Sequence, residues 1–221
     1  MGIKAGPRIL KDGLVFQIDS TVVRSYSGSG NTIYPLSGSL NGALNNGVGF
    51  TSDNNGALTF DGTNDYIQYS TNLVPLTSTP FTISVWCRRG RNINAFEELL
   101  SQWTSGTSWN AFFFGFYGSL VRLSDNWDNI AVSGAGNTNV WMNLVAVNSV
   151  SNAFIYFNGL LSATKGGTGL TYTGTGAFVI GRQGETAEYF QGNIAQVQIY
   201  NRALTAQEIL QNYNAMKGRY I

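Results

Sequence analysis

Apolar and polar residues alternate along most of the chain with the period of two that a half-buried β-strand shows. The clearest example is FTISVWCRR, residues 81–89. It places Phe81, Ile83, Val85 and Cys87 on one side of a strand and Thr82, Ser84, Trp86 and Arg88 on the other. Similar runs recur between residues 13 and 200 and predict about twelve to fourteen short strands, which is typical of a two-sheet antiparallel sandwich.

The interruptions of this pattern predict how the strands are connected. Residues 20–55 are rich in Gly, Ser and Asn, and we expect a long loop there that lies along a sheet edge. Asn158-Gly159, between two alternating runs, is a strong signal for a two-residue hairpin. There is no internal repeat and no break in composition. Residues 1–221 are therefore predicted to form a single domain.

The last alternating run is followed by a predicted short helix at residues 205–217. Thr205 is placed as its N-cap, and Glu208 three positions later completes a capping box. Leu204 and Ile209 have the spacing of a hydrophobic staple. A helix this short is not stable alone and must dock on the sandwich. We expect it to cover an edge or an end of a sheet, where it would block association between strands.

Composition and charge narrow the range of functions. Charged residues make up 11% of the chain, against about 25% in typical soluble domains. The net charge is +1 without any basic run, which argues against a nucleic-acid partner or an anionic membrane. No apolar run reaches the roughly 18 residues of a membrane span. Histidine is absent, which excludes Ser-His-Asp and Cys-His catalysis and His-ligated zinc.

Several motifs spread over nearly the whole chain resemble one family. They are GLVFQID, LTFDGTNDYIQY, FTISVWCRR, WMNLVAVNSVSNAFIYFNGLL, VIGRQG and FQGNIAQVQIYNRALTAQEI. With them the chain resembles the laminin-G-like jelly rolls of the concanavalin A-like lectin/glucanase superfamily. The stretch from SYSGSG to LTFDGTNDYI further resembles the subset found in structural proteins of tailed and marine phages. The resemblance implies an all-β, antiparallel two-sheet jelly-roll sandwich whose concave face or rim loops often bind carbohydrate beside a calcium ion.

The chain departs from this family at a position relevant to calcium. Relatives commonly carry an acidic pair after a Gly-x-Ile motif, where this sequence has Ala195 and Gln196. Calcium takes six to eight oxygen ligands, and carboxylates supply much of the affinity. Asp61 and Asp65 remain as weak candidates for calcium ligands. The sequence requires no cofactor, and it allows a calcium ion.

Two segments carry the residue types that hold sugars, which are aromatic rings for stacking and planar amides or carboxylates for hydrogen bonds. They are QWTSGTSWN and SDNWDN, and their candidate residues are Trp103, Trp109, Asp125, Asn126, Trp127 and Asp128. Alternatively, these tryptophans pack on the sheet or in a subunit contact, and the Asp and Asn side chains stabilise turns. Asp125 or Asp128 could equally be calcium ligands.

The acidic residues do not form the pair that a glycosidase needs. Such enzymes place two carboxylates about 5 to 9 Å apart on either side of the sugar bond. Glu97 and Glu98 are adjacent, so on a strand their side chains point to opposite faces. Glu185 and Glu188 lie three apart in a Gly- and Gln-containing loop. We therefore expect the protein not to be an enzyme.

One cluster of positive charge, RRGR, contains Arg88, Arg89 and Arg91. Three charges within four positions at the end of a strand are more typical of a solvated strand end than of a phosphate site. The single cysteine, Cys87, is on the apolar side of its predicted strand, and we expect a buried, inert thiol.

The function that the sequence favours is a non-catalytic structural or adhesive module. Most specifically it is a phage virion protein, for capsid decoration or associated with a tail or fibre, with a lectin-type fold that binds surface glycans. Its partners would be other virion proteins and host-surface carbohydrate, with assembly into a homo-oligomer and no nucleic acid or membrane. The first alternative is a soluble bacterial glycan-binding lectin domain that is extracellular or at the cell surface. The second alternative is a glycoside hydrolase.

Overall fold

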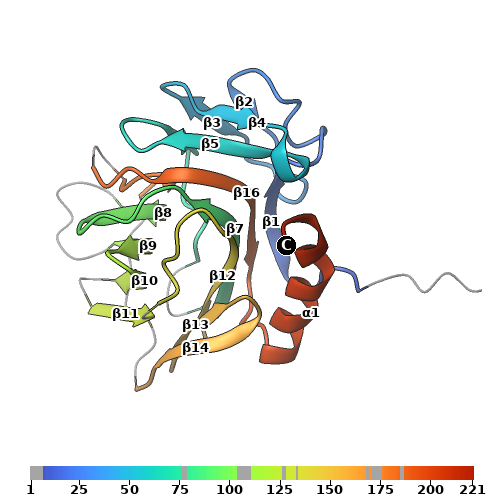
Figure 1. The fold of residues 1–221 in the computed structure, drawn as a ribbon. Helices are drawn as coiled ribbons and strands as arrows, with labels where there is room; N and C mark the ends of the chain where they lie inside the picture. Colours follow the sequence, from blue (N-terminus) through green and yellow to red (C-terminus); the bar gives the residue numbers. More distant parts are fainter. Residues whose placement is uncertain are drawn as a thin grey trace, which may run out of the picture.

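Two antiparallel sheets of eight strands each face one another in the computed structural model of the chain (Figure 1). The structure describes residues 7–75, 79–103, 111–125, 128–132, 134–167, 170, 176–184 and 187–221, with the backbone alone for 128–132. The all-β, two-sheet jelly-roll prediction is confirmed. Within the described residues no helix is long and apolar enough to cross a membrane.

The first sheet, called sheet A, contains the strand that starts the alternating pattern and the strand that ends it. Its order is β14 (Leu160–Lys165), β13 (Ala153–Phe157), β12 (Trp141–Asn148), β7 (Phe81–Arg89), β16 (Gln191–Tyr200), β5 (Ala57–Asp61) and β4 (Gly49–Thr51), with β1 (Leu14–Asp19) paired to β16. The long strands β7 and β16 pair over most of their length and form the centre of this sheet.

The second sheet, called sheet B, lies opposite. Its order is β11 (Asp128–Val132), β10 (Leu120–Asp125), β9 (Phe112–Tyr117), β8 (Phe96–Gln102), β15 (Phe178–Ile180), β6 (Tyr66–Gln68), β3 (Gly42–Asn45) and β2 (Thr32–Ile33). Strands β5 and β6 follow each other in the chain, yet they belong to different sheets, so the turn at residues 62–65 crosses from one layer to the other.

The core is built from the alternating positions that the sequence pattern indicated. Ile83, Val85 and Cys87 of β7 are fully buried in the same cluster as Phe114 and Phe116 of β9. Burial raises the pKa of the Cys87 thiol, which fits the expected inert cysteine. The sandwich is therefore held by a layer of aliphatic and aromatic side chains shared by the two sheets.

The segment 20–55 lies at the sheet edges as predicted, but it is not a plain loop. It contains the short strands β2, β3 and β4 and the 3₁₀ helix η1 (Asp53–Asn55). Tyr26 and Ile33 bury their side chains and anchor it, whereas the Tyr34 side chain is 51% exposed. Short edge strands of this kind were missed because two to four residues are too few to show an alternating pattern.

The hairpin between β13 and β14 confirms the prediction made from Asn158-Gly159. Asn158 has φ 49° and Gly159 has φ 83°, the left-handed conformation that a type I′ turn requires at both central positions. Asn and Gly adopt this conformation at low cost, so the turn residues specify the register of the two strands.

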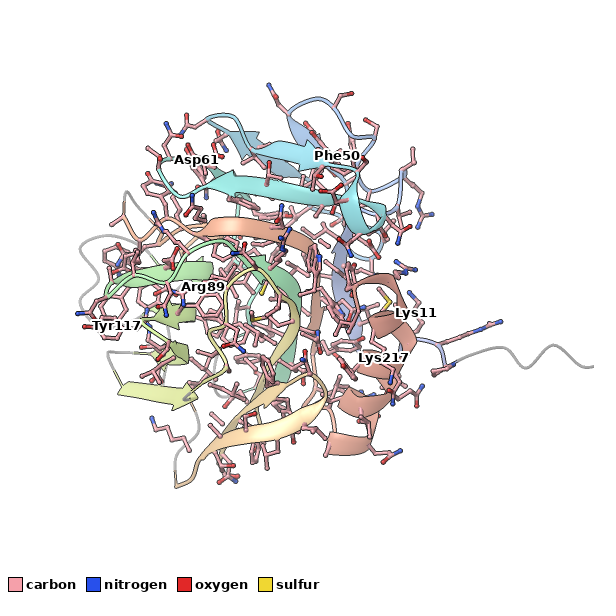
Figure 2. The ribbon with its side chains drawn as sticks, in the orientation of Figure 1. Lys11, Phe50, Asp61, Arg89, Tyr117 and Lys217 are labelled. Atoms are coloured by element: carbon pink, nitrogen blue, oxygen red, sulfur yellow. The ribbon has the colours of Figure 1, made fainter. Side chains whose placement is uncertain are left out.

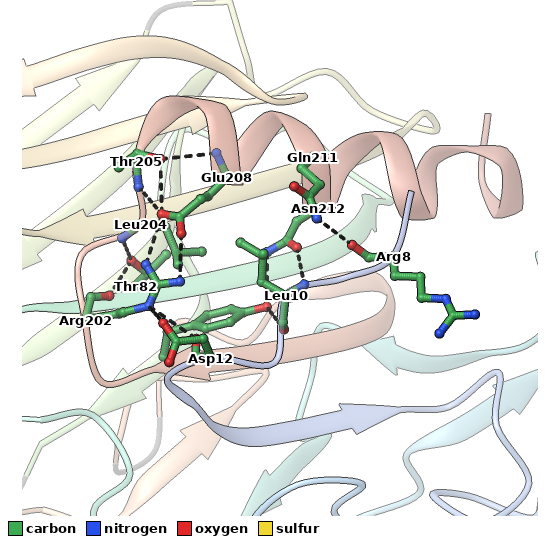
Figure 3. A network of polar contacts seen from close by, with 11 residues as sticks. Arg8, Leu10, Asp12, Thr82, Arg202, Leu204, Thr205, Glu208, Gln211 and Asn212 are labelled. Carbon is green, nitrogen blue, oxygen red and sulfur yellow. Dashed lines mark hydrogen bonds and ion pairs between the residues drawn. The ribbon is translucent and has the colours of Figure 1, made fainter. Parts of the chain in front are cut away.

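The C-terminal helix α1 (Ala206–Met216) begins where the capping box placed it. The Thr205 hydroxyl accepts a hydrogen bond from the Glu208 backbone N–H, and the Glu208 carboxylate accepts one from the Thr205 N–H at 2.8 Å (Figure 3). A short 3₁₀ helix, η2 (Lys217–Arg219), follows directly. The predicted helix at 205–217 is confirmed.

The location of α1 corrects the sequence prediction, because the helix lies on the outer face of sheet A and not at an edge or an end (Figure 1). Ile209 packs with Tyr200, and Met216 joins the buried cluster that contains Trp86. The Trp86 ring stacks on Tyr213 with ring centroids 5.8 Å apart. Large apolar side chains on the outer face of the central strands thus require a cover, and the helix supplies it.

Polar contacts fix the segment around Leu10 to the same helix (Figure 3). The Asn212 side chain accepts a hydrogen bond from the Leu10 N–H at 2.8 Å and donates one to the Tyr200 hydroxyl at 3.0 Å. Arg202 forms a two-pronged ion pair with Glu208, with N–O distances of 2.8 and 2.9 Å. The helix is therefore held by hydrogen bonds as well as by apolar packing.

Candidate functional site

Glu97 and Glu98 are adjacent acidic residues on β8, and their side chains lie on opposite faces of sheet B. Glu97 lies on the inner face, inside the sandwich, and Glu98 on the outer face. Glu97 lies opposite Phe116, whose ring belongs to the core, and Glu98 lies opposite Gly115 on β9. Both carboxylates are fully buried. As the sequence predicted, neighbouring residues of one strand point to opposite faces of the sheet.

On the inner side, Glu97 is bound by two arginines at the end of β7. One of its oxygens accepts hydrogen bonds from Arg89 Nε at 2.9 Å and Nη2 at 2.5 Å, and the other accepts one from Arg91 Nε at 2.7 Å. The Arg89 guanidinium also lies over the Phe116 ring, 4.5 Å from its centroid. A buried carboxylate and a buried guanidinium stabilise one another here because neither can be solvated by water.

This contact corrects the prediction that the RRGR cluster is a solvated strand end. Arg89 is 0% exposed, and only 30% of the Arg91 side chain is exposed. Arg89 also donates to the carbonyl oxygens of Gly118 and Gly136, at 2.6 and 3.2 Å. The cluster therefore joins the β7–β8 connection to the neighbouring turns. It also fixes the position of the Arg91 side chain.

On the outer side, Arg122 of β10 reaches across β9 and forms an ion pair with Glu98. Its guanidinium lies over the ring of Phe96, 4.3 Å from the centroid, and 5.5 Å from that of Phe113. Gly115 makes this crossing possible, since a β-carbon there would stand 2.6 Å from Glu98 Oε2 and 2.1 Å from the Glu97 carbonyl.

Glu188, in the connection before β16, is the third carboxylate of the site. Its carbonyl accepts a hydrogen bond from the Glu98 N–H at 2.9 Å, and its backbone has the left-handed φ of 59°. Burial raises the pKa of the Glu188 carboxyl, and the positive charge of Arg122 acts in the opposite direction. Burial lowers the pKa of Arg122 to about 10. The two groups therefore interact electrostatically in a poorly hydrated place.

Arg91, Phe96 and Glu188 border an open pocket of about 500 Å³, called the Tyr117 pocket. Its lining includes Arg91, Asn94, Phe96, Tyr117, Glu188 and Tyr189. Figure 2 shows Tyr117, Arg89 and Asp61 on the side of the molecule opposite helix α1. The volume is in the range of ligand pockets, and aromatic rings with a few convergent polar groups are the usual lining of such a site.

The pocket combines the groups that bind a sugar ring. Tyr117 is 38% exposed, and one side of its ring packs on Phe96 with centroids 4.7 Å apart. Arg91 is a hydrogen-bond donor, the Glu188 carboxylate an acceptor, and the Asn94 amide supplies both. An aromatic surface beside one fixed donor and one fixed acceptor can stack on the C–H face of a sugar and hold its hydroxyl groups.

The residues predicted from sequence lie at the other end of sheet B. Trp103 follows β8 and contacts Phe113 with ring centroids 6.4 Å apart, and Asp125 ends β10 with its side chain fully buried. Pairing of the strands brings these two segments to the same end of the sheet. Trp109, Asn126 and Trp127 lie outside the described residues, as does the side chain of Asp128. A glycan contact at this end stays a prediction.

The two candidate calcium ligands are close to each other, and both already accept hydrogen bonds from the backbone. Asp61 Oδ1 accepts from the N–H groups of Thr63 and Asn64 at 2.7 and 3.2 Å, and Asp65 Oδ2 accepts from the Asp61 N–H at 3.0 Å. The bond from Thr63 lowers the pKa of Asp61, and burial raises that of Asp65. In the part of the chain that the structure describes, no three His, Cys, Asp or Glu residues gather as metal ligands. Calcium binding stays a prediction.

Ala195 and Gln196 have structural roles in this chain. Ala195 is buried in the cluster below α1, at a register shift between β16 and β7. The Gln196 amide donates a hydrogen bond to Asp19 Oδ2 at 2.9 Å, and Arg219 binds the same oxygen at 3.1 Å. An amide in place of an acid here avoids repulsion with the buried Asp19 carboxylate.

A second cavity, of about 490 Å³, lies beside these residues and is called the basic groove. Its lining includes Arg8, Lys11, Asp19, Gln196, Met216 and Arg219. The three basic side chains are exposed, and the groove is on the α1 side of the molecule, where Figure 2 labels Lys11 and Lys217.

Sequence reasoning missed most of the Tyr117 pocket. Glu188 was considered only as half of a catalytic pair, and Phe96, Tyr117 and Arg122 were not singled out. One signal was present: the apolar run of β9 contains Gly115, and an isolated glycine within a strand often marks a close approach of other groups.

Comparisons with known proteins agree with this architecture. A family model described as the concanavalin A-like lectin/glucanases superfamily matches residues 61–210. No curated protein matches the sequence. Among solved structures, the binding domain of botulinum neurotoxin DC in complex with SialylT has a TM-score of 0.69 at 16% identity, and the match covers 93% of this chain and 52% of that one.

Two further solved structures contain sialic-acid ligands. The sialidase of Trypanosoma rangeli in complex with sialic acid has a TM-score of 0.73 at 12% identity, covering 100% of this chain and 36% of that one. The CBM40 of the Ruminococcus gnavus IT-sialidase, bound to alpha2,3 sialyllactose, has a TM-score of 0.52 at 20% identity, covering 60% and 80%. At these identities the likeness shows the fold, and the chain spans about half the length of the neurotoxin domain.

Proposed function

The chain belongs to the concanavalin A-like lectin/glucanase superfamily, and from this premise we propose that it is a non-catalytic module that binds carbohydrate in the Tyr117 pocket. The observation that carries the proposal is the half-exposed Tyr117 ring beside the Arg91 donor and the Glu188 acceptor in a cavity of about 500 Å³. Solved structures of similar fold that hold sialic acid or sialyllactose support a sugar as the ligand.

The arrangement of the acidic residues favours binding over hydrolysis. Glu97 is held by two arginines inside the sandwich, and Glu98 is held by Arg122 on the other face. Glycosidases need two carboxylates that flank one glycosidic bond. Two carboxylates on opposite faces of a sheet cannot do this. Glu188 is the one carboxylate among the described residues that line the pocket.

We expect the substitution Tyr117→Ala to weaken glycan binding about tenfold, because it removes the exposed aromatic surface on which a sugar would stack. A glycan array followed by calorimetry on the best ligand measures the effect. Tyr34→Ala is a matched control, since Tyr34 is also an exposed tyrosine, 51% accessible, on another part of the surface. Equal binding by wild-type protein and Tyr117→Ala would place the sugar site elsewhere.

We further propose a place in a phage virion, as a capsid decoration protein or a tail- or fibre-associated protein, where repeated copies would gain avidity for host-surface glycans. This rests on the sequence resemblance to phage structural proteins, and the alternative of a soluble bacterial lectin domain uses the same pocket. Antibody labelling of particles separates the two, because a virion protein is found at regular sites on the particle. Its absence from purified particles would favour the bacterial lectin.

A further inference from the structure

We propose that the Tyr117 pocket selects neutral sugars over sialylated or otherwise acidic ones, and that Glu188 is the residue which determines this selectivity. The inference rests on the proposed function and narrows its ligand class. It sets this chain apart from the similar structures that contain sialic acid. The reason is that Arg89, Arg91 and Arg122, the arginines near the pocket, are already bound to carboxylates of the protein.

The charges around the pocket compensate one another in two groups. Arg89 and Arg91 share the carboxylate of Glu97. Arg122 is paired with Glu98 and also interacts with Glu188. The first group has an excess of one positive charge and the second an excess of one negative charge, so the described residues around the pocket together carry no net charge that would attract an anion.

The Arg91 guanidinium cannot offer a carboxylate ligand two parallel N–H groups. Its Nε is bound to Glu97 at 2.7 Å. Its Nη2 donates to the carbonyl oxygens of Tyr189 and Gly62, at 2.8 and 3.3 Å. Strong recognition of a carboxylate by arginine uses two parallel N–H groups. Among the contacts of the described residues only Nη1 is left for a ligand, and its two N–H groups diverge from one nitrogen, so they cannot form the parallel pair of bonds and suit a sugar hydroxyl as well as a carboxylate.

The guanidinium of Arg122 is likewise already bound by groups of the protein. It is 3% exposed, and its guanidinium is covered by the rings of Phe96 and Phe113 and bound by Glu98. Its positive charge therefore serves to hold Glu98 and Glu188 in place. A ligand anion would have to displace one of these carboxylates to reach it, which would leave a buried charge unpaired.

Glu188 supplies the repulsive element. It lines the pocket, and its half-buried side chain interacts with the charge of Arg122. A sialic-acid carboxylate placed beside it would meet a like charge, whereas a sugar hydroxyl would donate a hydrogen bond to it. Selectivity of this kind depends on the penalty against the wrong ligand as much as on contacts with the right one.

The test compares pairs of glycans that differ only in a terminal sialic acid, on an array and then by calorimetry. We expect wild-type protein to bind the neutral member at least tenfold more tightly, and Glu188→Gln to reduce this ratio at least fivefold, because the amide keeps the shape and removes the charge. Asp53→Asn is the control: it removes one exposed carboxylate in η1, remote from the pocket lining, and should leave the ratio unchanged. Circular dichroism confirms that each variant is folded.

The possible results separate the two proposals. Preference of the wild type for sialylated glycans overturns the selectivity and leaves carbohydrate binding intact. An unchanged ratio in Glu188→Gln overturns the role of Glu188. Acidic glycans that bind equally well to Tyr117→Ala would point to the basic groove and overturn the assignment of the ligand class to this pocket. Absence of binding to every glycan overturns the proposed function itself.

Discussion

At the scale of single residues, the ion pair inside the sandwich joins the two opposite sheets. Glu97 and Arg89 are both 0% exposed and lie on successive strands of opposite sheets. The sequence shows three arginines within four positions, and such a local run indicates a solvated face. Their acidic partner becomes visible only once the two sheets are placed against each other, so this contact could not be predicted from local pattern.

We expect Glu97→Gln to lower the free energy of unfolding by about 3 to 5 kcal/mol, because the substitution leaves the buried Arg89 guanidinium without a counter-charge. Urea denaturation followed by tryptophan fluorescence measures the change. The control is Asp12→Asn, which removes a carboxylate that is 85% exposed and pairs with Arg202 at the surface. Its expected effect is below about 1 kcal/mol. A similarly small effect of Glu97→Gln would mean that the buried pair contributes little to stability.

At the scale of elements, the C-terminal helix is the part of the fold that the sequence predicts best. Its start depends on Thr205 and Glu208, which act within one turn, so local sequence is sufficient to locate it. Its position on sheet A depends on Trp86 and Tyr200, which project from the outer face of two central strands. Trp86 interrupts an otherwise polar row in the sequence, and that exception is the signal that the outer face is covered.

The capping box predicts how the stability of the helix depends on pH. The hydrogen bonds from Arg202, and then those from Thr205, lower the pKa of Glu208 to about 2, from an ordinary value of 4.5. A carboxyl whose pKa is lower in the folded state stabilises the protein above its unfolded pKa, and this contribution is lost as pH falls from about 4.5 towards 2.

We therefore expect Glu208→Gln to be less stable than wild type by about 1 kcal/mol at pH 7, with water screening the partly exposed ion pair, and the difference to vanish near pH 2. Thermal melting followed by circular dichroism at several pH values measures it. Gln207→Ala, at an exposed neighbouring position, is the control and should show no such pH dependence. A stability difference that persists at pH 2 would contradict this account.

At the scale of the whole molecule, the sandwich follows from a repeated local feature, whereas the pocket does not. Alternation of apolar and polar residues is present in each long strand, so the fold class can be read from the sequence. The Tyr117 pocket takes its residues from separated segments, among them 91–96, Tyr117 and 188–189. The sequence draws attention to Arg91 and Glu188 for other reasons, as part of a charge cluster and of an acidic pair, and Phe96 and Tyr117 carry no signal of their own.

The placement of helix α1 also affects how the protein can be tethered. Helix α1 and the last residues of the chain lie across the molecule from Tyr117 (Figure 2). A linker attached at the C-terminal side would point the proposed binding pocket away from its support. A biosensor chip coupled through that side would leave the pocket accessible to glycans in solution, whereas random coupling would bury it in a share of the molecules.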